Sequence, residues 1–148
     1  YKPLFLCEIL GESMATTKEL LRELFITNGL DKDEDTWELP YGKHSTIITR
    51  TGIEKIQFHN NINVTFILES KDPEFLIVKA IASKDGQYME SYGEASKLNL
   101  KKKENSPLYP VAMAEKRALS RVILKIVGLY KYGVFGEDEA EEFKRENK

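Results

Sequence analysis

The chain has 148 residues, a formal net charge of −2 and one cysteine, Cys7. This length suits a single domain with an ordinary hydrophobic core. One cysteine excludes an intrachain disulfide and favours a reducing compartment, so we expect a cytoplasmic protein. The acidic balance argues against a uniformly basic nucleic-acid binder. No apolar run reaches the roughly 18 residues of a membrane helix, so no membrane partner is expected.

Charge is distributed unevenly along the chain. Residues 1–40 carry 4 basic and 9 acidic groups, and residues 132–148 carry 3 basic and 6 acidic groups. Between them, residues 97–131 carry 9 basic and only 2 acidic groups. A basic block between acidic ends can create a local positive field although the total charge is close to neutral.

The first 45 residues are predicted to form an N-terminal helical extension. Thr16 and Glu19 have capping-box spacing at the start of a helix. A stripe of leucines and Phe25 follows at helical spacing, and Gly29 suits the helix end. Residues 31–45 are polar and rich in turn formers, which predicts a loop.

A second helix and three strands are predicted next. Thr51 and Glu54 have capping-box spacing for a short helix that ends near Asn60. Residues 62–70 alternate, with Val64, Phe66 and Leu68 on one face of a strand. Residues 74–83 are apolar on both faces, which is typical of a central strand. Asp85 and Gly86 predict a tight hairpin turn into a third strand at 87–96.

Pro110 suits the first turn of a long helix that runs to about Leu129. A basic loop precedes this helix, and an acidic segment at 132–148, with a short helix, follows it. The sequence therefore predicts one α+β domain: a three-stranded antiparallel β-meander packed by a long helix and preceded by two shorter helices.

The long helix carries a basic stripe. Arg117, Arg121 and Lys125 stand at i, i+4 and i+8, on one side of a helix with 3.6 residues per turn. Ala118, Leu119, Val122, Ile123, Ile126 and Val127 form the predicted core face. The stripe has only Glu115 as a nearby acidic neighbour along the helix, so we expect it to be solvent-exposed and unpaired. Met113 and Leu124 also fall outside the predicted core face.

Such a stripe has three interpretations that the residues alone leave open. It is a solvated helix face, a surface for a nucleic acid, or a docking face for another anionic partner, such as an acidic protein. Like charges at i and i+4 destabilise a helix slightly, which favours a polyanion partner. The candidate nucleic-acid-binding residues are Arg117, Arg121, Lys125, Lys116, Lys101, Lys102 and Lys103.

An ordered set of motifs then points to a family. The motifs are KDGQYMESYGEAS, YPVAMAEKRALSRVILKIVG, GVFGEDEAEEF and the upstream IITRTGIEKIQFHNNINVTF. Over roughly residues 46–143 the chain resembles the single-strand DNA annealing proteins, which comprise the Rad-fifty-two-like mediators and the phage Erf and Sak types. Residues 46–131 would be the annealing-protein-like core, and Gly93 matches a small residue of the third strand.

The resemblance implies a protein of phage or prophage type that binds and anneals single-stranded DNA in recombination and repair. It implies a homo-oligomer, in the form of a ring or filament, and no nucleotide cofactor. The family holds the DNA backbone in the region of Arg117, Arg121 and Lys125. Tyr88 and Tyr92 are candidates for base stacking, although packing on the sheet explains them equally well.

Other chemistries find little support. His44 and His59 have no metal-ligand partner at suitable spacing. Asp72, Glu74 and Lys79 surround a strand, but Ile77 stands where a metal nuclease needs a carboxylate. There is no glycine-rich phosphate loop. We therefore expect no catalytic residues, no cofactor, no metal and no small-molecule substrate. The competing hypothesis is a non-catalytic interaction or structural module with a basic docking face.

Overall fold

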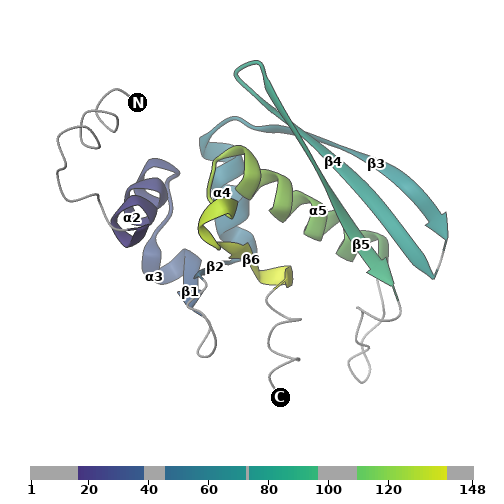
Figure 1. Ribbon diagram of the computed structural model, residues 1–148, viewed down its shortest axis with the longest axis horizontal. Helices are drawn as coiled ribbons and strands as arrows, with labels where there is room; N and C mark the ends of the chain where they lie inside the picture. The colour runs from purple at the N-terminus through teal and green to yellow at the C-terminus, as the bar shows by residue number, and fades with distance from the viewer. Residues whose placement is uncertain (1–16, 39–45, 73, 97–109, 140–148) are drawn as a thin grey trace.

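A computed structural model of the protein describes residues 17–38, 46–72, 74–96 and 110–139. Two β-sheets, each of three strands, share one long helix (Figure 1). The elements that precede the large sheet are α2 (Thr17–Thr27), α3 (Lys32–Asp35), β1 (Thr36–Glu38), β2 (Thr46–Ile48) and α4 (Arg50–His59).

The large sheet is the predicted meander. Its strands β3 (Asn63–Asp72), β4 (Phe75–Lys84) and β5 (Gln87–Ser96) are antiparallel neighbours, with β4 in the centre. After β5 the described residues form α5 (Pro110–Ile126), a 3₁₀ turn η1 (Tyr130–Tyr132) and β6 (Phe135–Gly136). The predicted α+β class and the order β-β-β-α are therefore confirmed.

Local chemistry explains the meander. Leu76, Val78, Ala80 and Ala82 alternate along β4 and are all buried, as a strand with one covered face requires. The hairpin between β4 and β5 turns at Asp85 and Gly86, whose φ angles of 50° and 79° are the left-handed values of the predicted turn.

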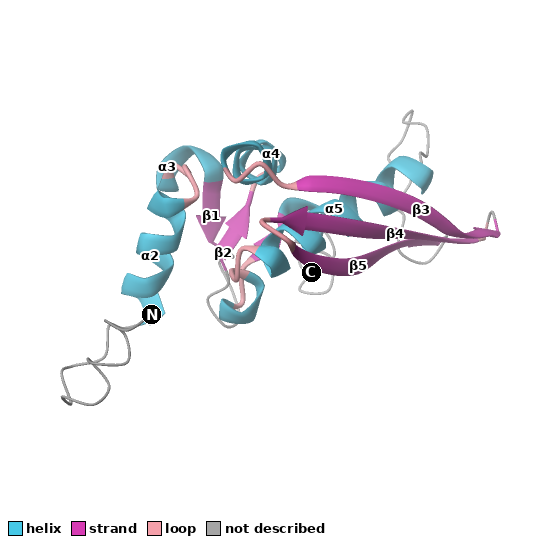
Figure 2. Ribbon diagram, turned by 90° about the horizontal axis from the view of Figure 1, so that it is seen from above, coloured by secondary structure: helices cyan, strands magenta, loops and turns pink. Residues whose placement is uncertain are grey.

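The long helix α5 lies against β5 and β4 (Figure 2). Gly93 of β5 makes the close approach possible. A Cβ atom at Gly93 would lie 2.1 Å from the carbonyl oxygen of Ala114 and 2.5 Å from the amide nitrogen of Ala118. The backbones of the helix and the strand therefore meet directly at this point.

The buried face of α5 is wider in the structure than the predicted core face. Ala118, Val122 and Ile123 are buried as expected, but Leu124, which falls outside the predicted core face, is also 0% exposed. Leu124 belongs to the same hydrophobic cluster as Ile53 and Ile56 of α4, and Met113 packs against that cluster. The helix is buried on the side facing the sheet and also on the side facing α4 and β6, so a prediction based on one apolar face was wrong.

The predicted loop at 31–45 was also wrong where the structure describes it. Residues 32–38 form α3 and β1, and β1 pairs with β2 in a small sheet of order β1-β2-β6. The parallel partner of β2 is β6, far along the chain, with Ile47 opposite Phe135. The cap of α4 is Thr49 rather than Thr51, since the Thr49 hydroxyl accepts a hydrogen bond from the Gly52 amide. The predicted cap Thr16 lies outside the described residues.

One face of the large sheet has no helix over it among the described elements (Figures 1 and 2). We call this the outer face. It carries the side chains that alternate with the buried ones, namely Thr65, Ile67, Phe75, Ile77, Lys79, Ile81, Tyr88, Glu90, Tyr92 and Glu94. None of the described helices is long and apolar enough to span a membrane.

Candidate nucleic-acid interface

The basic stripe of α5 lies along the outer edge of β5. The Arg117 guanidinium donates to the carbonyl oxygen of Glu94 at 2.7 Å, and that of Arg121 donates to the carbonyl oxygen of Tyr92 at 2.8 Å. The Lys125 ammonium donates to the Ser91 hydroxyl at 3.1 Å. The stripe therefore supplies donors to the edge of β5 that no described strand pairs with.

The rise per residue along α5 and along β5 makes this series of contacts possible. Four residues of an α-helix rise about 6 Å, and two residues of an antiparallel strand extend about 6.8 Å. Residues 117 and 121 of α5 therefore keep step with residues 94 and 92 of β5, running in opposite directions. The i, i+4 repeat that indicated a polyanion surface has a structural explanation as a cover for the strand edge.

Arg121 also has two acidic partners. Its guanidinium lies 3.0 Å from a carboxylate oxygen of Glu94 and 2.7 Å from one of Glu139. Burial lowers the pKa of the Arg121 guanidinium, but the hydrogen bonds to Glu94 and Glu139 outweigh burial and raise this pKa above its ordinary value. The expectation of an unpaired stripe was wrong, because these partners come from β5 and from the C-terminal acidic segment.

Arg117 is only 3% exposed, so its expected place on the surface was also wrong. Lys116 and Lys125 are half-buried, and the Lys125 ammonium lies 5.6 Å from the centre of the Tyr130 ring. Lys101, Lys102 and Lys103 lie outside the described residues.

The structure brings Arg117, Arg121 and Lys125 together as predicted, but points them at the protein's own strand. That these residues contact DNA stays a prediction.

The outer face of the sheet combines aromatic and acidic groups. Tyr88 is 75% exposed and Tyr92 47% exposed. Glu69, Phe75, Ile77, Tyr92 and Glu94 line a shallow hollow on this face. The side chain of Lys79 pairs with Glu90 at 3.3 Å. Carboxylates repel phosphates, so this face is better suited to a protein than to a nucleic acid.

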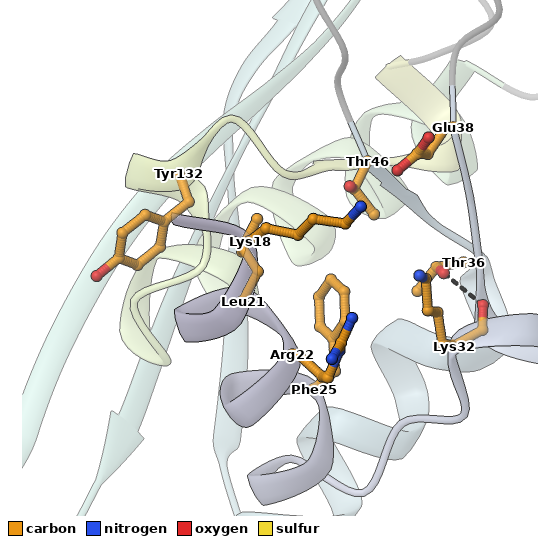
Figure 3. A pocket seen from close by; sticks show the side chains of 9 residues that line it. All are labelled: Lys18, Leu21, Arg22, Phe25, Lys32, Thr36, Glu38, Thr46 and Tyr132. Atoms are coloured by element: carbon orange, nitrogen blue, oxygen red, sulfur yellow. Dashed lines mark hydrogen bonds between the residues drawn. The ribbon is translucent and has the colours of Figure 1, made fainter. Parts of the chain in front are cut away.

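A cleft of about 390 Å³ lies between α2 and the small sheet (Figure 3), at the end of the molecule away from the large sheet (Figure 1). Helix α2 forms one wall, and α3 with the small sheet forms the other. The cleft is lined by Lys18, Leu21, Arg22, Phe25, Lys32, Thr36, Glu38, Thr46 and Tyr132. The sequence hides this site because residues 1–40 are acidic overall and Lys32 stands between aspartates. The available signal was the i, i+4 spacing of Lys18 and Arg22 beside the apolar stripe of α2.

No family model, curated protein or solved structure matches this chain. The family assignment therefore rests on the sequence motifs. Within the described ranges, no three His, Cys, Asp or Glu residues are grouped to hold a metal ion.

Proposed function

We propose that the protein binds single-stranded DNA and anneals complementary strands in recombination or repair, in the cytoplasm and without a nucleotide cofactor. The observation that carries this proposal is the order of the core: a three-stranded antiparallel meander followed directly by a long helix across it. This is the arrangement that the resemblance in residues 46–143 implies.

Physical chemistry gives a simple route from binding to annealing. Lysine and arginine side chains neutralise phosphates and release counterions, which gives affinity without sequence preference. A strand held by its phosphates leaves its bases free to meet a complementary strand. Pairing then releases free energy of its own, so no nucleotide hydrolysis is required.

The first prediction is salt-sensitive binding with annealing that needs no ATP. We expect a labelled single-stranded oligonucleotide to bind with an affinity that falls linearly with the logarithm of salt concentration. Annealing of two complementary oligonucleotides, followed by the fluorescence of a terminal dye pair, should be faster with the protein and unchanged by a chelator.

The controls separate this function from its alternative. A duplex of the same length should bind more weakly, and heat-denatured protein should not accelerate annealing. An acidic-protein docking module would give no salt-dependent shift of the oligonucleotide. Acceleration only with added nucleotide or divalent metal would contradict the proposal.

We further propose that the protein works as a homo-oligomer, either a ring or a filament. The two edges of the large sheet support this. The edge of β5 is covered by Arg117 and Arg121, whereas no described strand pairs with the outer edge of β3. Phe66, Ile67 and Leu68 of β3 are 38%, 46% and 40% exposed. An uncovered edge with apolar side chains on both faces is a template for a second copy.

The second prediction tests this edge. Ile67→Lys should reduce the molar mass measured by light scattering to that of one chain, because a lysine on an edge strand opposes strand pairing. Tyr88→Lys is the matched control, since it adds the same charge at an exposed position of β5 and should leave the mass unchanged. A parent protein that is a monomer with and without DNA would contradict the proposal.

A further inference from the structure

The cleft between α2 and the small sheet holds cations without counterions. Elsewhere in the described residues, ion pairs join Arg50 with Asp138, Lys55 with Asp35, Lys79 with Glu90, and Arg121 with Glu94 and Glu139. Within the described part of the chain, Lys18, Arg22 and Lys32 have no such partner. Three unpaired cations therefore line one cleft.

The local fold separates these cations from the acidic groups of the same segments. Lys18, Arg22 and Phe25 fall on one side of α2 at i, i+4 and i+7, and Glu19 and Glu23 fall on the adjacent side. Like charges at i and i+4 slightly destabilise an isolated helix, so the spacing of Lys18 and Arg22 does not itself stabilise α2. Lys32 faces them from α3, across the cleft (Figure 3). Glu38 is the one carboxylate among the lining residues, which leaves the lining with a net positive charge.

The remaining lining fits an extended strand of nucleotides. Thr46 offers a hydroxyl and Tyr132 a half-buried ring at the same cleft, whereas Phe25 is only 6% exposed and packs in the hydrophobic core. Cations that neutralise phosphates beside aromatic side chains are the two elements of single-strand recognition that does not depend on sequence. Lys18, Arg22 and Lys32 are all exposed, so their charged groups can reach phosphates of a strand that lies over the cleft.

We propose that this cleft holds the sugar-phosphate backbone of single-stranded DNA, with Lys18, Arg22 and Lys32 as the phosphate contacts. The inference rests on the proposed function and deepens it. It gives a role to the N-terminal extension, which lies outside the part of the chain that resembles the annealing proteins. It also places the strand away from the guanidinium groups of α5, which already contact β5.

The test compares two triple variants of the full chain. The cleft variant is Lys18→Gln with Arg22→Gln and Lys32→Gln. The control variant is Lys79→Gln with Lys84→Gln and Arg50→Gln, which removes the same charge from the large sheet and from α4. Far-UV circular dichroism and thermal unfolding first establish that both variants are folded.

We expect the cleft variant, and not the control variant, to lose affinity for single-stranded DNA. Each phosphate contact on a single strand contributes about 0.7 to the slope of log affinity against log salt concentration, so the slope should become shallower by about 2. At about 0.1 M salt the same relation predicts a loss of affinity on the order of 100-fold. The control variant should bind within about threefold of the parent, because general electrostatic attraction alone changes.

Other outcomes overturn the inference. If the parent and the cleft variant bind and anneal equally well, the DNA lies elsewhere and the proposed function survives. If only the control variant loses affinity, the strand lies along the large sheet and α4 rather than in the cleft. If a polyglutamate peptide of equal charge displaces the oligonucleotide as well as unlabelled DNA does, the cleft is a site for acidic proteins. A parent that binds no single-stranded DNA would overturn the proposed function as well.

Discussion

Gly93→Ala should destabilise the protein by about 3 kcal/mol or more, at the upper end of the usual range for overpacking. The added methyl group would meet the backbone of α5 at Ala114 and Ala118 rather than a side chain that could rotate away. The helix must therefore move off the sheet and expose part of the core. In a chain of this size, this loss corresponds to a fall in melting temperature of roughly 10 °C, measured by circular dichroism.

A second glycine provides the control. Gly86 has nothing within 4 Å of the position where its Cβ would be, and its φ angle is +79°. Asparagine tolerates this left-handed conformation better than other residues, so Gly86→Asn should change stability by less than about 1 kcal/mol. A Gly93→Ala protein as stable as the parent would show that α5 does not cross the sheet at this point.

Arg121→Gln should also cost about 3 kcal/mol, the size expected when one partner of a largely buried ion pair is removed. Glutamine cannot reach both carboxylates, and Glu139 is only 8% exposed, so its charge would be left poorly compensated. The free energy of unfolding, measured by urea titration, should fall without a change in the dependence on urea concentration.

Lys116→Gln on the same helix is the matched control. Lys116 is half-buried and has no ion pair within the part of the chain that the structure describes, so its change in stability should stay within about 0.5 kcal/mol. The opposite pattern, an Arg121→Gln protein with parental stability but little affinity for DNA, would restore the sequence-based interpretation of the stripe as a DNA contact.

Elements that depend on neighbours in sequence could be predicted. The apolar run on both faces of residues 74–83 identified β4 as the central strand, and Asp85 with Gly86 identified the turn that follows it. Pro110 and the helical spacing after it identified α5. In each case the signal and the structure lie within one element, so periodicity and turn chemistry were sufficient.

Elements that depend on distant partners could not be predicted. Strand β2 has three residues and is held by β6, which follows it by almost 90 positions. The acidic partners of Arg121 lie 27 and 18 positions away in sequence. A helical wheel shows only neighbours within one helix, so it presented Arg117 and Arg121 as unpaired. The cleft was missed for the same reason, because its cations come from two helices.

Nearly equal spacing of arginines and carbonyl groups allows more than one alignment of α5 on β5 to form similar hydrogen bonds. A shift of the helix by one turn would place Arg117 near the Tyr92 carbonyl, where it could form the hydrogen bond that Arg121 now forms. Gly93 distinguishes the alignments, because it has no side chain. Only one alignment places the α5 backbone at Ala114 and Ala118 against Gly93. The position of α5 is therefore determined by its contact with Gly93 of β5, and not by the hydrogen bonds of the arginines. A change in the length of the connection between β5 and α5 should therefore leave α5 at the same place on the sheet.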